Sequence, residues 1–160
     1  MFTLYADASG GKSIGTTVVF GWLSQNSQWE LFDYDWRILL AKYDLPYLHM
    51  REFAHFHGPF ENWKGQDNKR ANFLRLVSET IHNRVHFGFT TRVGHQDFAE
   101  VDSEYRFKEF VGNPYSLAAR SCIAKANLWV KKNQRDIPMN YVSPTHSSFL
   151  IEARAAATAS

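Results

Sequence analysis

The feature that most constrains the fold is a pair of β-type runs near the start of the chain, joined by a glycine-containing turn. The first run is Phe2–Ala6 and the second is Thr16–Leu23, and both are rich in β-branched and aromatic residues. Asp7–Gly11, between them, consists of small and polar residues and glycines that are typical of turns. The pattern predicts a hairpin at the centre of a sheet, with Asp7 where the first strand ends. Because Thr16–Leu23 is apolar almost throughout, we expect that strand to be buried on both faces.

The rest of the chain alternates between helical and strand-like patterns. The expected elements, in chain order, are a third strand at Trp29–Phe32, a helix over Tyr34–Tyr43, a helix capped by Asp67 and Asn68, a strand over Val85–Val93, a helix opened by Asn113 and Pro114, and a strand over Ile137–Val142. This order predicts an α/β fold with a mixed sheet, antiparallel N-terminal strands and flanking helices.

Three segments do not fit a regular element. Pro46–Gly65 is rich in histidine, phenylalanine and glycine and is expected to be a long irregular loop of the kind that often carries function. Gly94–Asp97 is expected to turn into a mixed, acidic segment. The alanine-rich end of the chain, residues 143–160, is expected to be a divergent tail or a frayed helix.

Composition favours one folded domain without covalent or metal staples. The chain has 160 residues, of which 44% are hydrophobic and 21% charged, as in ordinary globular proteins. Its one cysteine, Cys122, has no partner within the chain, which argues against a disulfide-stabilised secreted protein. Cys122 falls on the apolar side of its expected helix, so we expect a buried and inert thiol.

Charge and hydropathy limit the kinds of partner that the chain is expected to bind. The formal net charge is +2, and the lysines and arginines are dispersed, so nucleic-acid binding is permitted but not required. No apolar stretch is long enough to span a bilayer, and the N-terminus has no pattern of a signal peptide. We therefore predict a cytoplasmic protein that does not engage membranes.

Asp7 is the first candidate for chemistry. A carboxylate at the end of a central strand is well placed to hold Mg²⁺ or Mn²⁺, because these ions need only one or two protein carboxylates besides a substrate phosphate. The alternative is that the Asp7 side chain caps the turn that follows it.

The histidine-rich segment offers a second candidate. His49, Glu52 and His55 are three residues apart, so on a helix they would share one face, with His57 nearby. They would form either a zinc site or a hydrogen-bonded, solvated histidine cluster. The spacing differs from that of the His-Glu-x-x-His zinc proteases.

Four segments together resemble the bacterial domain-of-unknown-function family 3800. They are the opening Leu4-Tyr5-Ala6-Asp7-Ala8-Ser9-Gly10, the second hydrophobic strand, Leu48-His49-Met50-Arg51-Glu52-Phe53, and the helix start Asn113-Pro114-Tyr115. Family members typically open with Tyr-Ile-Asp-Glu-Ser-Gly and carry a Leu-His-x-x-Glu-Leu segment. The resemblance covers most of residues 2–142 in order.

The resemblance implies a ribonuclease-H-like domain over residues 1–142 with metal-dependent phosphodiesterase activity. Asp7 would match the first metal-binding aspartate, and His49 with Glu52 would match the second conserved patch. The chain departs from the pattern at Ala8, which replaces an acidic residue, and after Val142, where the family continues with an acidic strand end. Both departures remove carboxylates from the implied site.

Three hypotheses follow from these patterns. The first is a Mg²⁺- or Mn²⁺-dependent nuclease with Asp7 and Glu52 as metal ligands and His49 as ligand, general base or phosphate donor. The second is a binding module of the same fold that has lost its chemistry and self-associates through the surface left open by the short C-terminus. The third is a zinc hydrolase centred on His49, His55 and His57.

Overall fold

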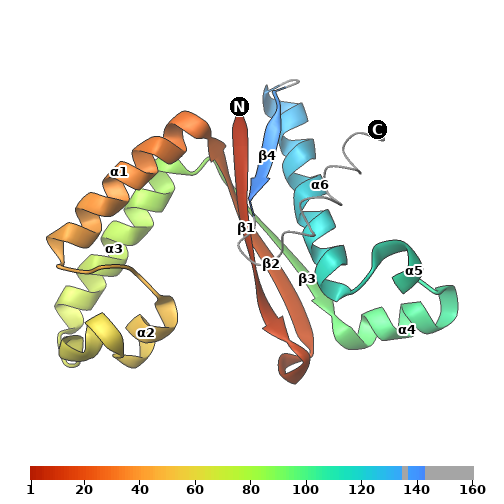
Figure 1. Ribbon diagram of the computed structural model, residues 1–160, viewed down its shortest axis with the longest axis horizontal. Helices are drawn as coiled ribbons and strands as arrows, with labels where there is room; N and C mark the ends of the chain where they lie inside the picture. Colours follow the sequence, from red (N-terminus) through yellow and green to blue (C-terminus); the bar gives the residue numbers. More distant parts are fainter. Residues whose placement is uncertain (135–136, 143–160) are drawn as a thin grey trace. The chain divides into compact units, whose positions relative to one another are not determined.

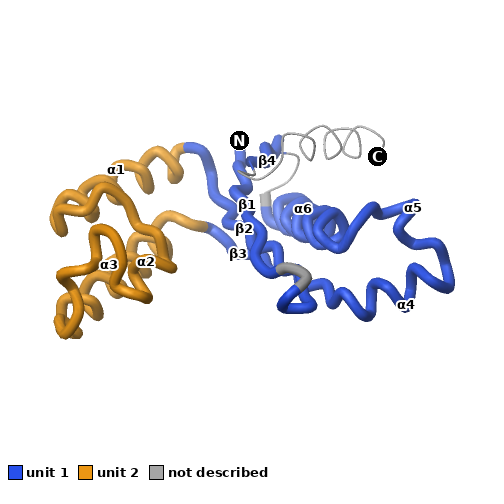
Figure 2. Tube along the Cα trace, turned by 60° about the horizontal axis from the view of Figure 1, so that its bottom comes forward, with its two compact units in different colours: residues 1–26, 86–160 blue, residues 27–85 orange. Residues whose placement is uncertain are grey.

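The computed structural model describes residues 1–134 and 137–142, and the chain divides into two compact units (Figure 2). Residues 1–26 and 86–160 belong to the first, called here the sheet unit, and residues 27–85 form the second, called the helical unit. The helical unit is therefore one continuous segment inserted between two strands of the sheet. No helix in the part of the chain that the structure describes is both long and apolar enough to cross a membrane.

The sheet unit is built on a four-stranded mixed sheet in the order β3-β2-β1-β4 (Figure 1). β2 (Thr16–Gln25) pairs antiparallel with both β1 (Phe2–Gly11) and β3 (Phe87–Gly94), whereas β4 (Met139–Val142) is parallel to β1. The mixed α/β fold and the central antiparallel hairpin are as predicted. The predicted tail, residues 143–160, lies outside the described residues, and the domain end at residue 142 stays a prediction.

β1 is longer than the sequence predicts. Its ladder with β2 continues past Asp7 to Gly11, so Asp7 lies in the middle of the strand, opposite Phe20, and the prediction that the strand ends at Asp7 is wrong. The turn is instead the short 3-10 helix Lys12–Ile14, followed by Gly15 with a φ of 67°. The small residues after Asp7 can pair because β2 offers ten residues of continuous extended chain.

β2 is buried on one face only, and the prediction of burial on both faces is wrong. Val19, Gly21 and Leu23 are buried, whereas Phe20 between them is exposed and Trp22 is half-buried. This alternation is the ordinary period of a strand with one covered face. The alternation is not evident from the sequence, because the residues on the face that faces away from the core are also apolar.

The covering helix is α6 (Pro114–Gln134), which lies along one face of the sheet (Figure 1). Four of its buried residues are small, namely Ala118, Ala119, Cys122 and Ala126, and Val130 is buried as well. The helix and sheet approach closely: a Cβ added at Gly21 would lie 3.1 Å from the Cys122 Sγ atom. The predicted buried thiol is confirmed.

The start of α6 also agrees with the sequence. The Asn113 Oδ1 atom accepts a hydrogen bond from the Ser116 backbone N–H at 2.9 Å, so Asn113 caps the helix as predicted. The residues after β3 do not form the expected turn. α4 (His95–Tyr105) begins directly after Gly94 and is followed by the short α5 (Lys108–Val111).

The helical unit contains α1 (Asn26–Lys42), whose first residue belongs to the sheet unit, α2 (Met50–His55), the 3-10 helix Gly58–Trp63 and α3 (Asp67–Arg84). The predicted strand at Trp29–Phe32 is wrong, because these residues are the first turns of α1. Phe32 contacts Trp29 and Trp36, with ring centroids 5.5 Å apart in each pair. Spacings of three and four residues bring side chains together on a helix, so the aromatic stripe belongs to α1.

The core of the helical unit is aromatic. Phe73 of α3 is fully buried against Phe53, Phe60, Trp63 and Tyr43, with ring centroids 5.0 to 6.4 Å away. The segment Pro46–Gly65, expected to be irregular, supplies three of these rings from two short helices. Packing of these rings therefore stabilises short helices in a segment whose polar residues and glycines are typical of a loop.

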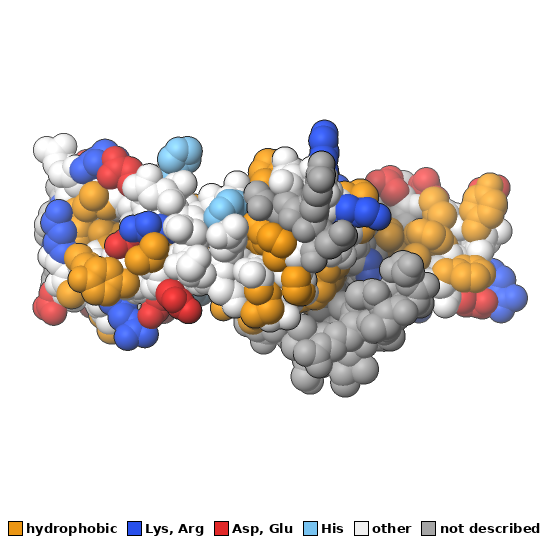
Figure 3. Space-filling model, turned by 90° about the horizontal axis from the view of Figure 1, so that it is seen from above, with side chains coloured by type: hydrophobic (Ala, Val, Ile, Leu, Met, Phe, Trp, Pro, Cys, Tyr) orange, Lys and Arg blue, Asp and Glu red, His pale blue; other side chains and the backbone are white. Residues whose placement is uncertain are grey.

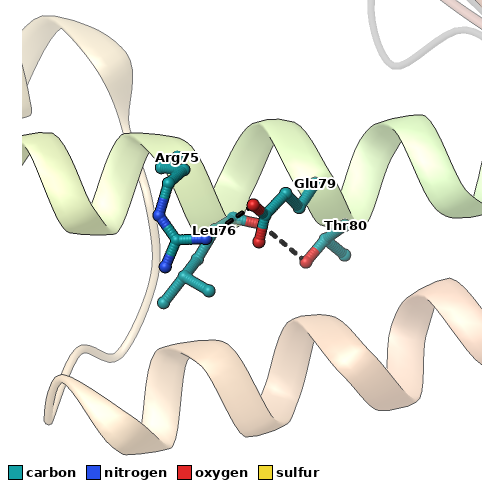
Figure 4. Close-up of polar contacts among 4 residues, drawn as sticks. All are labelled: Arg75, Leu76, Glu79 and Thr80. Atoms are coloured by element: carbon teal, nitrogen blue, oxygen red, sulfur yellow. Dashed lines mark hydrogen bonds and ion pairs between the residues drawn. The ribbon is translucent and has the colours of Figure 1, made fainter.

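α3 begins without the predicted cap. Asp67 is the first helical residue, and Gln66 precedes it with no side-chain capping bond. Asp67 still favours the start of the helix because its negative charge lies in the first turn. Farther along, Arg75 pairs with Glu79 at 2.5 Å, and the Thr80 hydroxyl donates to the Leu76 carbonyl at 2.9 Å (Figure 4).

Candidate functional site

Asp7 lies on the face of the sheet that α6 does not cover. The residues before and after it, Ala6 and Ala8, pack against the core beneath α6, and strand alternation directs Asp7 to the opposite face. Its side chain is exposed, and its Oδ1 atom accepts a hydrogen bond from the Ala8 backbone N–H at 2.8 Å. The carboxylate therefore makes a local contact with the backbone, as in the capping alternative, but from within a strand.

His49 and Glu52 belong to the helical unit, and α2 brings them together. His49 is the N-cap residue of α2 and Glu52 lies in its first turn. The His49 Nδ1 atom is 3.8 Å from the Glu52 Oε1 atom, with side chains 61% and 31% exposed. The spacing of three residues thus gives the shared face that the sequence predicts.

The Glu52 carboxylate is the most constrained group of this region. It hydrogen-bonds the Tyr47 hydroxyl, and chiefly this bond raises the pKa of Tyr47, with burial and the negative charge of Glu52 adding to it. A Cβ added at Gly58 would lie 3.1 Å from Glu52 Oε2, and Gly58 has a φ of 56°, so glycine suits this position in both space and backbone conformation. Oε2 itself is buried and has no partner with full hydrogen-bond geometry.

Five side chains around this carboxylate line an open pocket of about 500 Å³, namely His49, Arg51, Glu52, His55 and His57. The His55 and His57 rings are 6.2 Å apart. Within residues 1–134 and 137–142, no group of three or more His, Cys, Asp or Glu side chains is placed to hold a metal ion. The histidines predicted as zinc ligands therefore share a pocket without converging on one point.

Two further aspartates, Asp97 and Asp102, make local contacts around α4. Asp102 lies on α4, and its carboxylate accepts a hydrogen bond from the Lys108 backbone N–H at 2.5 Å. Asp97, also on α4, lies against Gly94 at the start of that helix. Both carboxylates stabilise the chain around α4, so their local contacts explain their presence.

Sequence reasoning missed the aromatic surroundings of Asp7. Phe20 lies directly opposite Asp7 in the β1–β2 ladder, and Tyr5 lies opposite Trp22. All three aromatic residues lie on the same face of the sheet as Asp7, by the period of two along each strand. The signal was present as an alternation in β2, but it was obscured because both faces of that strand carry apolar residues.

Comparison with known proteins gives no match to a family model, a curated protein or a solved structure. The resemblance to the domain-of-unknown-function family 3800 therefore stays a hypothesis that depends on short motifs.

Proposed function

We propose that this chain is a ribonuclease-H-like domain that acts on nucleic acid as a Mg²⁺- or Mn²⁺-dependent phosphodiesterase, with Asp7 as its principal metal ligand. The position of Asp7 carries the proposal: an exposed carboxylate in mid-strand, on the uncovered face of a central strand. Three antiparallel strands followed by a fourth parallel to the first support the fold part of the proposal.

The donor set fits one ion better than two. Mg²⁺ keeps several waters and needs only one or two carboxylates besides a substrate phosphate, which Asp7 can satisfy. A two-metal site needs several carboxylates converging on ions about 3.5–4 Å apart, and the described residues hold no such group. When bound, the ion would stabilise negative charge on the phosphate as a Lewis acid.

Glu52 and His49 are a second proposed patch, which lies within the helical unit. Because Glu52 Oε2 is buried, Glu52 would offer Oε1, the oxygen that lies near His49. The Tyr47 hydroxyl and the tight turn at Gly58 would hold this carboxylate in place. His49 is exposed enough to serve as a ligand, a general base or a phosphate donor.

A second candidate function is a nucleic-acid-binding module of the same fold without hydrolysis. It is favoured by the lack of any three-ligand metal group among the described residues. A cytoplasmic location and self-association of the chain are further proposals, and sedimentation of the purified protein tests the latter.

The deciding experiment measures thermal unfolding with and without Mn²⁺ for the wild type, Asp7→Asn, Glu52→Gln and Glu100→Gln. Glu100 is an exposed carboxylate on α4 and serves as the control. A ligand that binds only the folded state adds about 2.7 kcal/mol at a hundredfold excess over its Kd. We expect Mn²⁺ to stabilise the wild type and Glu100→Gln, and to lose this effect in Asp7→Asn.

Hydrolysis is then measured on single- and double-stranded oligonucleotides with Mn²⁺ or with EDTA. Full cleavage by a folded Asp7→Asn protein would exclude the proposed role of Asp7. Absence of both Mn²⁺ stabilisation and cleavage in the wild type, with oligonucleotide binding retained, would favour the binding module.

A further inference from the structure

The uncovered face of the sheet carries aromatic residues on both of its central strands. Tyr5 on β1 is 45% exposed and Phe20 on β2 is 37% exposed, although both lie well inside long strands. Covered and uncovered faces differ sharply in this sheet, because Leu4 and Val19, the neighbours of these residues, are buried beneath α6. Exposed aromatic rings in the middle of a sheet require a reason beyond core packing.

Trp22 extends this aromatic surface across β3. Its ring packs edge-to-face against Phe20 at 4.5 Å between centroids. A Cβ added at Gly88, the residue opposite Trp22 on β3, would lie 2.8 Å from Trp22 Cζ3, so the absence of a side chain at Gly88 makes room for the indole. Phe20 and Trp22 therefore form an aromatic pair on β2, and Tyr5 lies on the same face of β1, two residues from Asp7.

We infer that this face is a stacking platform for the unpaired bases of single-stranded nucleic acid. The inference depends on the proposed function and specifies its substrate. Four-stranded sheets with aromatic residues on two central strands stack two or three bases in this way, and every base offers a π-face to such a surface. Because bases in a duplex are already stacked, only an unpaired strand can use the rings of Tyr5 and Phe20.

The charges on and around this face favour binding of a nucleic-acid strand whose backbone passes close to Asp7. Arg92 lies on the same face of β3, opposite Val18, and its Nη2 atom is 3.5 Å from the Thr16 hydroxyl. The positive charge of Arg92 complements a phosphate. Because adjacent β-strands are only about 4.8 Å apart, bases stacked on the rings bring their phosphates near Asp7. On the side of the molecule drawn in Figure 3, basic and acidic side chains of the described residues are interspersed.

The test measures binding of a fluorescent oligothymidylate of about twelve nucleotides by anisotropy, in EDTA and at low salt. The variants are Tyr5→Leu and Phe20→Leu, with Phe110→Leu as the control, since Phe110 is 72% exposed but lies on α5. We expect roughly tenfold weaker binding for each platform variant and no change for the control. A duplex of the same length should bind more weakly than the single strand.

Unchanged binding in both platform variants, or equal binding of duplex and single strand, would overturn the inference. A wild-type dimer that Phe20→Leu dissociates, with no oligonucleotide binding, would also overturn it and assign the face to a second copy of the chain. Asp7→Asn separates this inference from the proposed hydrolysis: in EDTA it should bind the oligonucleotide at least as tightly as the wild type, because it removes a negative charge near the phosphates, whereas with Mn²⁺ it should lose cleavage. Binding through Phe20 without any cleavage would retain the platform and reject the hydrolase, whereas cleavage insensitive to Phe20→Leu would do the reverse.

Discussion

The sheet unit and the helical unit solve the same problem, burial of an apolar core, with different side chains. In the sheet unit, small residues of α6 lie against aliphatic strand residues such as Leu4 and Leu23, and backbone ladders join segments far apart in the sequence. In the helical unit, which is one continuous segment, rings of Phe53, Phe60 and Trp63 fill the core. Small residues let α6 approach the sheet closely, whereas large rings, together with Leu39, Leu45 and Val77, fill the space between the helices of the helical unit.

The two units also differ in where polar chemistry is exposed. In the described part of the sheet unit, α6 packs on one face of the sheet, and Asp7 lies with aromatic residues on the other. The helical unit gathers imidazoles and the Glu52 carboxylate around a pocket at the end of α2. The first arrangement suits a flat, extended ligand, and the second suits a small polar group. Because of this contrast, we propose nucleic-acid binding for the sheet unit and not for the helical unit.

Replacement of the central ring of the helical unit should have the largest effect on stability. Phe73→Ala removes a fully buried ring that contacts four other aromatic residues. We expect a loss of about 3–5 kcal/mol in the free energy of unfolding, concentrated in residues 27–85. Hydrogen exchange followed by mass spectrometry measures this loss separately in each unit.

Leu74→Ala is the matched control, since Leu74 is the next residue on α3 and is 37% exposed. It should change the free energy of unfolding by far less than Phe73→Ala. Equal losses in the two variants would contradict a core centred on Phe73.

The close approach of helix and sheet should make the sheet unit sensitive to a single added methyl group. In Gly21→Ala the new Cβ would lie 2.9 Å from Leu4 Cδ1 and 3.1 Å from Cys122 Sγ. We expect a loss of about 1–3 kcal/mol from overpacking, measured by urea denaturation. Adding Cys122→Ala should recover part of this loss, because it removes one of the two crowded atoms. Strictly additive effects would mean that Cys122 does not limit the space at Gly21.

A cation stabilises the aromatic core of the helical unit from its edge. The Arg70 guanidinium carbon lies 4.3 Å from the ring centre of Phe56 and 4.8 Å from that of Phe53, and Nη2 is 3.4 Å from the Phe53 carbonyl oxygen. Arg70→Met should lower the free energy of unfolding by about 1–2 kcal/mol. Arg75→Met is the control, because Arg75 pairs only with Glu79 on the exposed side of α3; a surface pair of this kind contributes about 0.5 kcal/mol or less.

Much of the fold could be predicted from local sequence. The hairpin, the capped start of α6 at Asn113 and the buried Cys122 follow from turn residues, capping chemistry and helical periodicity. The first turns of α1 could not, because Trp29 and Phe32 favour strands as isolated residues. The contacts of Phe32 with Trp29 and Trp36 have helical spacing, but they extend beyond the four residues of the predicted strand.

The candidate site could be predicted only where its contacts are local. His49 and Glu52 are one helical turn apart, so their proximity followed from spacing alone. The contact of Tyr47 with Glu52 could not be predicted, because Tyr47 precedes α2 in a part of the chain without regular secondary structure, where spacing does not set the direction of a side chain. The aromatic neighbours of Asp7 required the register of β1 against β2, which no local pattern specifies.

The smallest expected effect concerns the thiol between α6 and the sheet, and it reports how tightly the two pack. Burial raises the pKa of Cys122 from its ordinary value of 9.0, and the positive charge of Lys125 only partly opposes the shift. The folded protein therefore retains the proton at pH values where the unfolded chain loses it, so stability falls as pH rises above about 9 towards the folded-state pKa. Below that range Cys122 adds no pH dependence.

Urea denaturation of the wild type and Cys122→Ala at pH 7 and at about pH 9.5 isolates this effect from that of other titrating groups. The stability advantage of the wild type over Cys122→Ala should be smaller at the higher pH. An advantage that is equal at both pH values would mean that the thiol is not shielded from water, and that α6 lies less tightly on the sheet than Gly21 and Cys122 indicate.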